Sequence, residues 1–207
     1  MLIEKPVTTF LDELASSAPA PGGGSAAALA AAIGAGLVSM VANLTVGKKQ
    51  YVDVQADIQR ILARSEQLRH QCQDLLERDV AAYTEVSRAF KMPRDTEEEK
   101  TTRDVAVQKA LKNATAVPME LAEVCVDILN LCPESAAKGN KNAVSDAGVG
   151  ALLAEAALRA AALNVLINLG SIKDEAFVKK ERAHLDSLLQ GKAELKEQIV
   201  KDVVAKL

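Results

Sequence analysis

Apolar residues recur at intervals of three and four positions along most of the chain, and this period is typical of α-helices. Runs rich in Val, Ile, Thr and Tyr that alternate with polar residues between turns, the pattern of half-buried strands, are not evident. The pattern therefore predicts an all-α protein built as a helical bundle.

The boundaries of the predicted helices in the first half follow residues that start or stop a helix. A short helix is expected over Pro6–Ser17, and Ser25 is a suitable N-cap for a second helix that ends near Asn43–Gly47. A long amphipathic helix is expected from about Asp53 to Lys91, and Pro93 stops it.

In the second half, the residues Thr96–Glu99 form a capping box that begins the next helix. This helix is expected to kink or break at Pro118 and to end at Pro133, because proline lacks the N–H that a helix interior needs. A loop over residues 133–142, a helix over 144–169 and a charged tail of one or two helices complete the prediction.

The second helix and the helix over 144–169 are rich in Ala and Gly. Helices in soluble bundles are usually about 8–10 Å apart, and small side chains allow a closer approach. We therefore predict that these two small-residue helices form a central pair and that longer amphipathic helices surround them.

Residues 26–46 carry no ionisable group and are long enough on paper to span a membrane. Large aliphatic residues are few, however, and flanking aromatic belts are missing. A helix buried in a protein core is the better interpretation, and no membrane association is expected.

Composition narrows the classes of function. The chain has 207 residues, of which 49% are hydrophobic and 2% aromatic, so one domain over residues 1–207 with an aliphatic core is expected. The net charge of −3 gives no basic face for nucleic acid. Three cysteines without C-x-x-C spacing are expected to be reduced thiols, and the first residues do not form a signal peptide, so a cytoplasmic location is expected.

Asp79 is the first candidate for chemistry. It shares one face of the long helix with Cys72, Leu76, Tyr83 and Val86, at spacings of three and four residues, so a carboxylate lies within an apolar stripe. Loss of hydration there raises the pKa of a carboxyl group and suits it to proton transfer. The structural alternative is an aspartate at the edge of the stripe that pairs with a cation such as Arg78.

Asp146 and Asn164 are a second candidate pair. They are 18 positions apart, which places them on one side of the same helix but about 27 Å apart at 1.5 Å per residue. They cannot contact one small reacting group in a single subunit. The alternatives are a helix-dipole role for Asp146 and interhelical hydrogen bonds for Asn164 and Asn168.

The stretch PGGGS over residues 21–25 precedes a helix, so its amides are suited to a ligand's acceptor atoms. It is not a Walker loop, because the Gly-Lys-Ser/Thr ending is missing. The two histidines lie among charged residues without the spacing of a di-iron bundle, so no metal is implied.

Three blocks together resemble a known family: PAPGGGSAAALAAAIGAGLVSMVANLTVGKKQY, RDVAAYTEVSRAFKMPRDTEEEK and NAVSDAGVGALLAEAALRAAALNVLINL. Their order and the chain length resemble the cyclodeaminase domain of the formiminotransferase-cyclodeaminase family and its stand-alone methenyltetrahydrofolate cyclohydrolases. The resemblance implies a helical bundle, usually a homodimer, that acts on tetrahydrofolate without a metal or further cofactor.

The resemblance implies one of two reactions at the N5/N10 bridge of tetrahydrofolate. A cyclodeaminase converts 5-formimino- to 5,10-methenyltetrahydrofolate and releases ammonia, and this reading is slightly favoured by the motif blocks. The alternative is a cyclohydrolase that opens the methenyl bridge to 10-formyltetrahydrofolate. A non-catalytic helical scaffold is the alternative from another class, but it leaves Asp79 and the glycines unexplained.

The same resemblance implies roles for individual residues. Asp79 is expected to be the acid/base, and Asp146 and Asn164 to bind the pterin. Ser25 would add a hydroxyl, and the backbone of the glycine loop would approach a flat ring. Lys48, with Lys138 and Lys141 as further candidates, would bind the anionic glutamate tail. The implied folate-binding set is Gly22, Gly23, Gly24, Ser25, Lys48, Asp146 and Asn164.

No formiminotransferase domain precedes these blocks within the 207 residues. If the chain is a cyclodeaminase, a separate formiminotransferase is therefore expected to supply its substrate.

Overall fold

The computed structural model describes residues 1–207 and consists of helices and connecting turns with no strand, which confirms the all-α prediction. The α-helices are α1 (Val7–Leu14), α2 (Gly23–Asn43), α3 (Gln55–Phe90), α4 (Glu97–Lys138), α5 (Val144–Leu169), α6 (Glu175–Leu189) and α7 (Lys192–Val204). Three short 3₁₀ helices are η1 (Leu2–Glu4), η2 (Lys49–Val54) and η3 (Lys141–Ala143).

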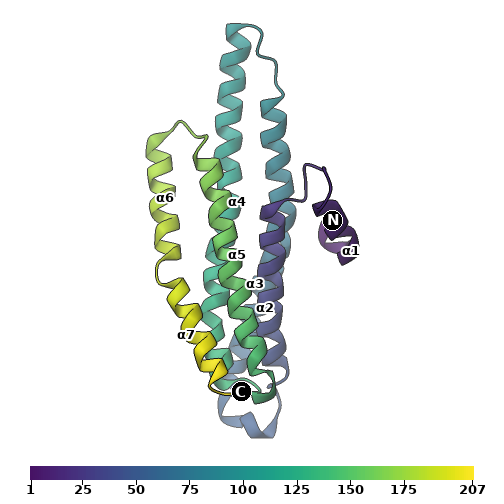
Figure 1. Cartoon of the computed structure of the whole chain (residues 1–207), viewed down its shortest axis with the longest axis vertical. Helices are drawn as coiled ribbons and strands as arrows, with labels where there is room; N and C mark the ends of the chain where they lie inside the picture. Colours follow the sequence, from purple (N-terminus) through teal and green to yellow (C-terminus); the bar gives the residue numbers. More distant parts are fainter.

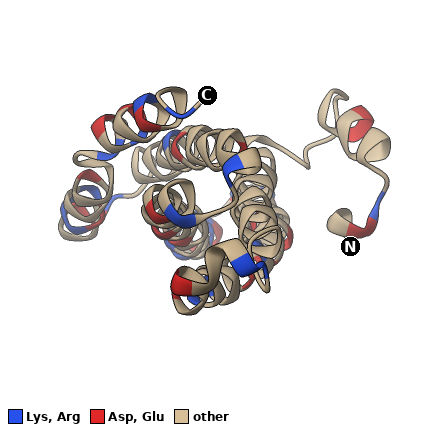
Figure 2. Cartoon of the chain, turned by 90° about the horizontal axis from the view of Figure 1, so that it is seen from below, with Lys and Arg blue, Asp and Glu red and all other residues tan.

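Four long helices form an elongated bundle in which α2 packs against α3 and α5, and α4 packs against the same two helices. The upper parts of α3 and α4 extend beyond the other helices as a hairpin (Figure 1). The α6–α7 pair lies along one side of the bundle, and the N-terminal segment stands on the other side (Figure 2). The predicted tail of one or two helices is thus two helices.

The central contact between α2 and α5 depends on glycine. A methyl group added at Gly34 would lie 3.1 Å from the carbonyl oxygen of Gly150, and one added at Gly150 would lie 3.2 Å from that of Gly34. Alanines on both helices, such as Ala31 and Ala154, are fully buried. The prediction of a closely packed central pair of small-residue helices is confirmed.

An expected break of α4 at Pro118 and its expected end at Pro133 are both wrong, because the helix continues through the two prolines to Lys138. Pro118 cannot donate to the carbonyl of Ala114, one turn earlier. The side-chain amide of Asn168 on α5 donates to that carbonyl instead, at 3.0 Å. A neighbouring helix therefore satisfies the acceptor that the proline leaves free, and the loop expected over 133–142 is largely helical.

The expectation that Ser25 caps α2 is also wrong. The helix begins at Gly23 with Gly22 as its N-cap, and Ser25 lies inside the first turn and is fully buried. Its hydroxyl is bound to a side chain of α3 rather than to the helix end.

Two helical segments, Gly23–Asn43 and Lys141–Leu169, are long and apolar enough to cross a membrane by length and composition alone. In the bundle, 61% and 44% of their most apolar windows are buried, which is also a property of core helices. The three cysteines are buried and unpaired, and burial raises the pKa of the Cys72 and Cys132 thiols to about 12.

Candidate active site

Asp79 lies two-thirds of the way along α3 and faces the first turn of α2. The hydroxyl of Ser25 donates a hydrogen bond of 2.7 Å to Oδ2 of Asp79. Because Ser25 is fully buried and belongs to a helix, this bond fixes the carboxylate against α2. Asp79 forms no ion pair, so the alternative in which it pairs with Arg78 is wrong; Arg78 binds Asp74 and Glu120 instead.

Gly24 makes this approach possible. A methyl group at position 24 would lie 2.1 Å from Oδ1 of Asp79, far inside van der Waals contact. A methyl group at Gly22 would meet nothing within 4 Å. Of the three consecutive glycines, Gly24 is therefore the one at which the carboxylate fills the space that a side chain would need.

Two influences act on the pKa of Asp79 in opposite directions. Burial raises the pKa above its ordinary value of 3.8, and hydrogen bonds from the hydroxyl and backbone of Ser25 lower it, with burial the larger effect. A raised pKa lets a carboxyl group exchange protons with a ligand closer to neutral pH. The sequence-based expectation about the pKa of Asp79 agrees with this direction.

The carboxylate opens into a pocket of about 390 Å³ between α2, α3, α4 and α5. Tyr83, Val86 and Phe90 continue up α3 from Asp79 and form one wall. Tyr83 and Phe90 are 48% and 47% exposed, so they face the pocket rather than the core. The sequence analysis placed Tyr83 in the apolar stripe and not in a pocket wall. The spacing of the two rings after Asp79, in a chain with so few aromatics, was the available signal.

Two asparagines of α5 lie on the opposite side of the pocket from α3. Asn164 is close to Gly23, since a methyl group there would lie 3.9 Å from Nδ2 of Asn164. That amide donates to the carbonyl of Ala160, which leaves its oxygen free for a ligand. Asn168 makes an interhelical hydrogen bond to Ala114, as its structural alternative anticipated.

The structure thus brings Asp79, Ser25, Asn164 and the glycine loop together. Asp146 and Lys48 do not join them: Asp146 is in the first turn of α5 and Lys48 precedes η2, both at the lower end of the bundle. A carboxylate in the first turn of a helix interacts favourably with the helix dipole, which is the alternative role given for Asp146 in the sequence analysis.

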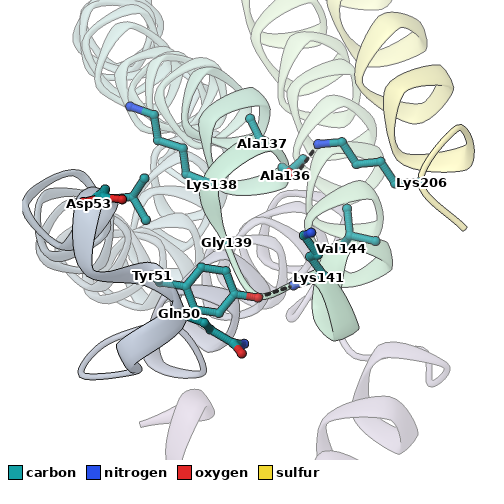
Figure 3. Close-up of a pocket in the computed structure, with 11 residues that line it drawn as sticks. Gln50, Tyr51, Asp53, Ala136, Ala137, Lys138, Gly139, Lys141, Val144 and Lys206 are labelled. Atoms are coloured by element: carbon teal, nitrogen blue, oxygen red, sulfur yellow. Dashed lines mark hydrogen bonds between the residues drawn. The ribbon is translucent and has the colours of Figure 1, made fainter.

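A second cavity, of about 550 Å³, lies at this lower end (Figure 3). Lys138, Lys141 and Lys206 line it, and the hydroxyl of Tyr51 accepts a hydrogen bond from the backbone N–H of Lys141. Lys138 is bound by Asp57 and Glu134, and Lys206 donates to the carbonyl of Ala136. The tail-binding lysines suggested by the sequence are therefore remote from Asp79 and partly engaged. No cluster of three or more His, Cys, Asp or Glu side chains could hold a metal ion.

The fold and the site define a class: helical-bundle proteins with a half-buried, unpaired carboxylate in an aromatic-walled pocket. The chain belongs to the formiminotransferase-cyclodeaminase family, whose sequence profile matches residues 6–187.

Individual relatives carry two different names. The chain is 47% identical to a methenyltetrahydrofolate cyclohydrolase of Methylorubrum extorquens, over 97% of both chains. It is 38% identical to the pig formimidoyltransferase-cyclodeaminase over 91% of this chain, but it spans only 35% of that protein. A formiminotetrahydrofolate cyclodeaminase of Thermotoga maritima superposes with a TM-score of 0.82 at 33% identity, over 100% of this chain and 98% of that one.

Proposed function

We propose that the chain is a methenyltetrahydrofolate cyclohydrolase that converts 5,10-methenyl- to 10-formyltetrahydrofolate, with residues 1–207 acting as one catalytic domain in the cytoplasm. The observation that carries this proposal is the apolar pocket with Asp79 at its base, held by Ser25 and unpaired with any cation. The 47% identity over nearly the whole of a cyclohydrolase supports this reaction over the deamination that the motif blocks slightly favoured.

The mechanism assigns Asp79 two proton transfers. Its carboxylate accepts a proton from a water molecule as the water oxygen bonds to the methenyl carbon, which gives a tetrahedral carbon between N5 and N10. The protonated carboxyl group then donates to N5 as the carbon–N5 bond breaks. The hydroxyl on that carbon loses its proton as the formyl group forms on N10, so one proton is released overall. A carboxyl group with a raised pKa serves both steps.

The rest of the pocket orients the substrate. The exposed faces of Tyr83 and Phe90 can stack on flat rings. The free oxygen of Asn164 and the bare backbone of Gly22 and Gly23 can meet polar edges of the pterin. Ser25 is assigned to holding Asp79 rather than to binding folate, because its hydroxyl already donates to the carboxylate.

The test follows the absorbance of the methenyl bridge with purified protein and 5,10-methenyltetrahydrofolate, corrected for the spontaneous hydrolysis. We expect accelerated decay with the wild-type chain and a loss of roughly 100-fold or more in the Asp79→Asn variant, because acid–base groups typically contribute that much. Decay at the background rate by a folded wild-type protein would contradict the proposal. Unchanged behaviour of the variant as well would favour the scaffold alternative.

Cyclodeamination is the second candidate. It is supported by the Thermotoga cyclodeaminase, which matches the entire chain in fold. In that reaction N10 attacks the carbon of the protonated formimino group on N5. Asp79 accepts the N10 proton and transfers it to the formimino nitrogen, and the bond between that nitrogen and the carbon breaks to release ammonia. Incubation with 5-formiminotetrahydrofolate and assay of ammonia decides between the two: ammonia release faster than the hydrolysis reaction would make a separate formiminotransferase the expected source of substrate.

We further propose that the chain forms a homodimer through one face of α2 and α5. Large apolar side chains with exposures of 37–73% follow this face from end to end: Ile33, Met40, Leu44, Val149, Leu152, Leu163 and Ile167. The two helices run antiparallel, with Gly23 beside Asn164 at the upper end and Leu44 bound by Asn140 at the lower end. A contiguous apolar surface of this kind is typical of an interface.

If the two-fold axis of this dimer is perpendicular to the long axis of the bundle, the second copy points in the opposite direction. The lower end of the partner, with its Asp146, would then lie beside the pocket that contains Asp79. We propose that Asp146 serves the pterin of the other subunit in this way, while Lys48 lies near the same end.

Two measurements test the dimer. Ile167→Glu should give a monomer in sedimentation analysis, whereas Val105→Glu, at a similarly exposed apolar site on α4, should not. Mixed dimers of Asp79→Asn and Asp146→Asn chains should regain about a quarter to a half of wild-type activity if the sites are shared. Mixtures as inactive as their components would contradict a shared site.

A further inference from the structure

A hollow of about 520 Å³, which we call the tip hollow, lies at the turn of the α3–α4 hairpin and along the first turns of α4. Four cations line it together with a single acid: Arg94, Lys100, Arg103, Lys173 and Asp104. Thr101 and Val105 complete the wall. This is a positively charged surface that the proposed chemistry at Asp79 does not use.

The tip hollow adjoins the active-site pocket through Phe90. The guanidinium of Arg103 donates twice to the carbonyl of Phe90, at 3.2 and 3.0 Å, and lies 5.6 Å from the centre of its ring. The ring itself forms the upper end of the pocket wall.

A second connection runs through Gln108. Its amide donates to the carbonyl of Ser171, which lines the pocket, and its oxygen accepts from the backbone of Lys173 in the tip hollow. The two cavities therefore share a wall.

Two of the four cations in the tip hollow have no counter-ion. Lys100 is paired with Glu97 and Lys173 with Asp104. Arg94 and Arg103 form no ion pair, so the hollow holds two positive charges that are not balanced. Arginine is well suited to bind carboxylates, because its fork of N–H donors matches the two oxygens.

We propose that the tip hollow binds the glutamyl carboxylates of the reduced-folate substrate, with Arg94 and Arg103 as its specificity residues. This inference rests on the proposed function. Phe90 is 11 residues beyond Asp79 on the same helix, about 16 Å along its axis at 1.5 Å per residue. A folate with its bridge at Asp79 and its benzoyl ring along Tyr83 therefore directs its carboxylates past Phe90 toward the two arginines.

This assignment replaces the one based on sequence. Lys138 and Lys141 lie at the opposite end of the bundle, and the ammonium group of Lys138 is already neutralised by Asp57 and Glu134. Since each further glutamyl residue adds a carboxylate, the proposal makes the site sensitive to the number of glutamates on the substrate.

The test compares KM for mono- and triglutamyl 5,10-methenyltetrahydrofolate. We expect a lower KM for the triglutamyl form with the wild type, and Arg94→Gln and Arg103→Gln should each reduce this preference by roughly fivefold, the effect of one partly exposed charge pair. Arg182→Gln, which removes an exposed arginine of α6, is the matched control and should retain the preference. The preference should also weaken as ionic strength rises.

The opposite results are equally distinct. Equal KM values for the two forms with the wild type, or an unchanged preference in both arginine variants, would overturn the tip hollow as the tail site. Loss of the preference in Lys141→Gln alone would place the tail at the lower cavity of a partner. Calorimetric titration with mono- and triglutamyl 5-formyltetrahydrofolate gives the same comparison without turnover, so failure of the proposed reaction and failure of the tail site are distinguishable.

Discussion

The environment of Asp79 disfavours its charge and also fixes the position of its carboxylate. Burial disfavours its charge, and the hydroxyl of Ser25 offsets part of that cost while holding one oxygen in place. The other oxygen occupies the space that any side chain at position 24 would need. The hydroxyl of Ser25 therefore affects the pKa and position of this carboxylate, and Gly24 leaves the space it needs. Each residue can be substituted separately.

Replacing Asp79 by Asn should stabilise the fold at neutral pH. Because the folded-state pKa of Asp79 lies above its ordinary 3.8, its contribution to stability is complete below that value and is lost as pH rises through the folded-state pKa. We expect the Asn variant to have the larger free energy of unfolding at pH 7. Urea unfolding of both proteins should show the gain shrinking as pH falls toward 3.8; a constant difference would contradict a raised pKa.

Removing the hydroxyl of Ser25 should change the pH dependence of the reaction. Ser25→Ala deletes hydrogen bonding that lowers the pKa of Asp79, so the acid limb of the kcat/KM profile should move to higher pH. A purely structural role would lower activity by the same factor at every pH. Ser16→Ala, at an exposed position before the glycine loop, is the control.

Gly24→Ala should remove activity, because its methyl group would lie 2.1 Å from Oδ1 of Asp79 and would displace the carboxylate. Gly22→Ala adds the same atoms two residues earlier, where nothing lies within 4 Å. The measurement is turnover of both variants alongside their far-ultraviolet circular dichroism. Wild-type activity in a folded Gly24→Ala variant would show that the carboxylate is not held as described.

At the scale of elements, α4 and α5 are joined by a bond that compensates for a proline. Asn168→Ala should cost about 1–2 kcal/mol, since it leaves the carbonyl of Ala114 without its donor. Pro118→Ala restores a backbone donor to that carbonyl. In urea unfolding, Asn168→Ala should therefore cost less in the Pro118→Ala background, and additive effects would contradict this coupling.

The same bond explains where the sequence was misleading. Periodicity was sufficient to place α3 and α5 within about two residues, because each helix carries its own apolar stripe. The effect of a proline is predicted from the residues of its own helix, however. The amide that compensates for Pro118 comes from a residue 50 positions later. Ser25 was misassigned for a similar reason, because its partner Asp79 is on another helix.

The whole molecule determines which candidate residues meet. The residue patterns indicated Asp79, the glycine loop and Asn164 one at a time, and the family resemblance assigned them to one folate. The bundle brings them to one pocket. Sequence reasoning could not show that Asp146 and Lys48 lie at the far end, because their distance from Asp79 depends on the order and direction in which four helices pack. It also did not single out Arg94 and Arg103, the residues proposed for the tail site, since charged residues near a turn look solvated until the adjoining pocket is seen.

The glycine-dependent contact between α2 and α5 has a consequence for how such a site can change. The position of the carboxylate relative to its hydroxyl donor is measured from α2, and α2 is seated against α5 at Gly34 and Gly150. A slightly larger residue at that contact, although remote from the pocket, would push α2 away from α5 and so change the position of Ser25 relative to the carboxylate of Asp79. The distance between α2 and α5 therefore determines the geometry of the proposed catalytic carboxylate. Outside the pocket, we expect substitutions at the contact between these two helices to reduce activity the most.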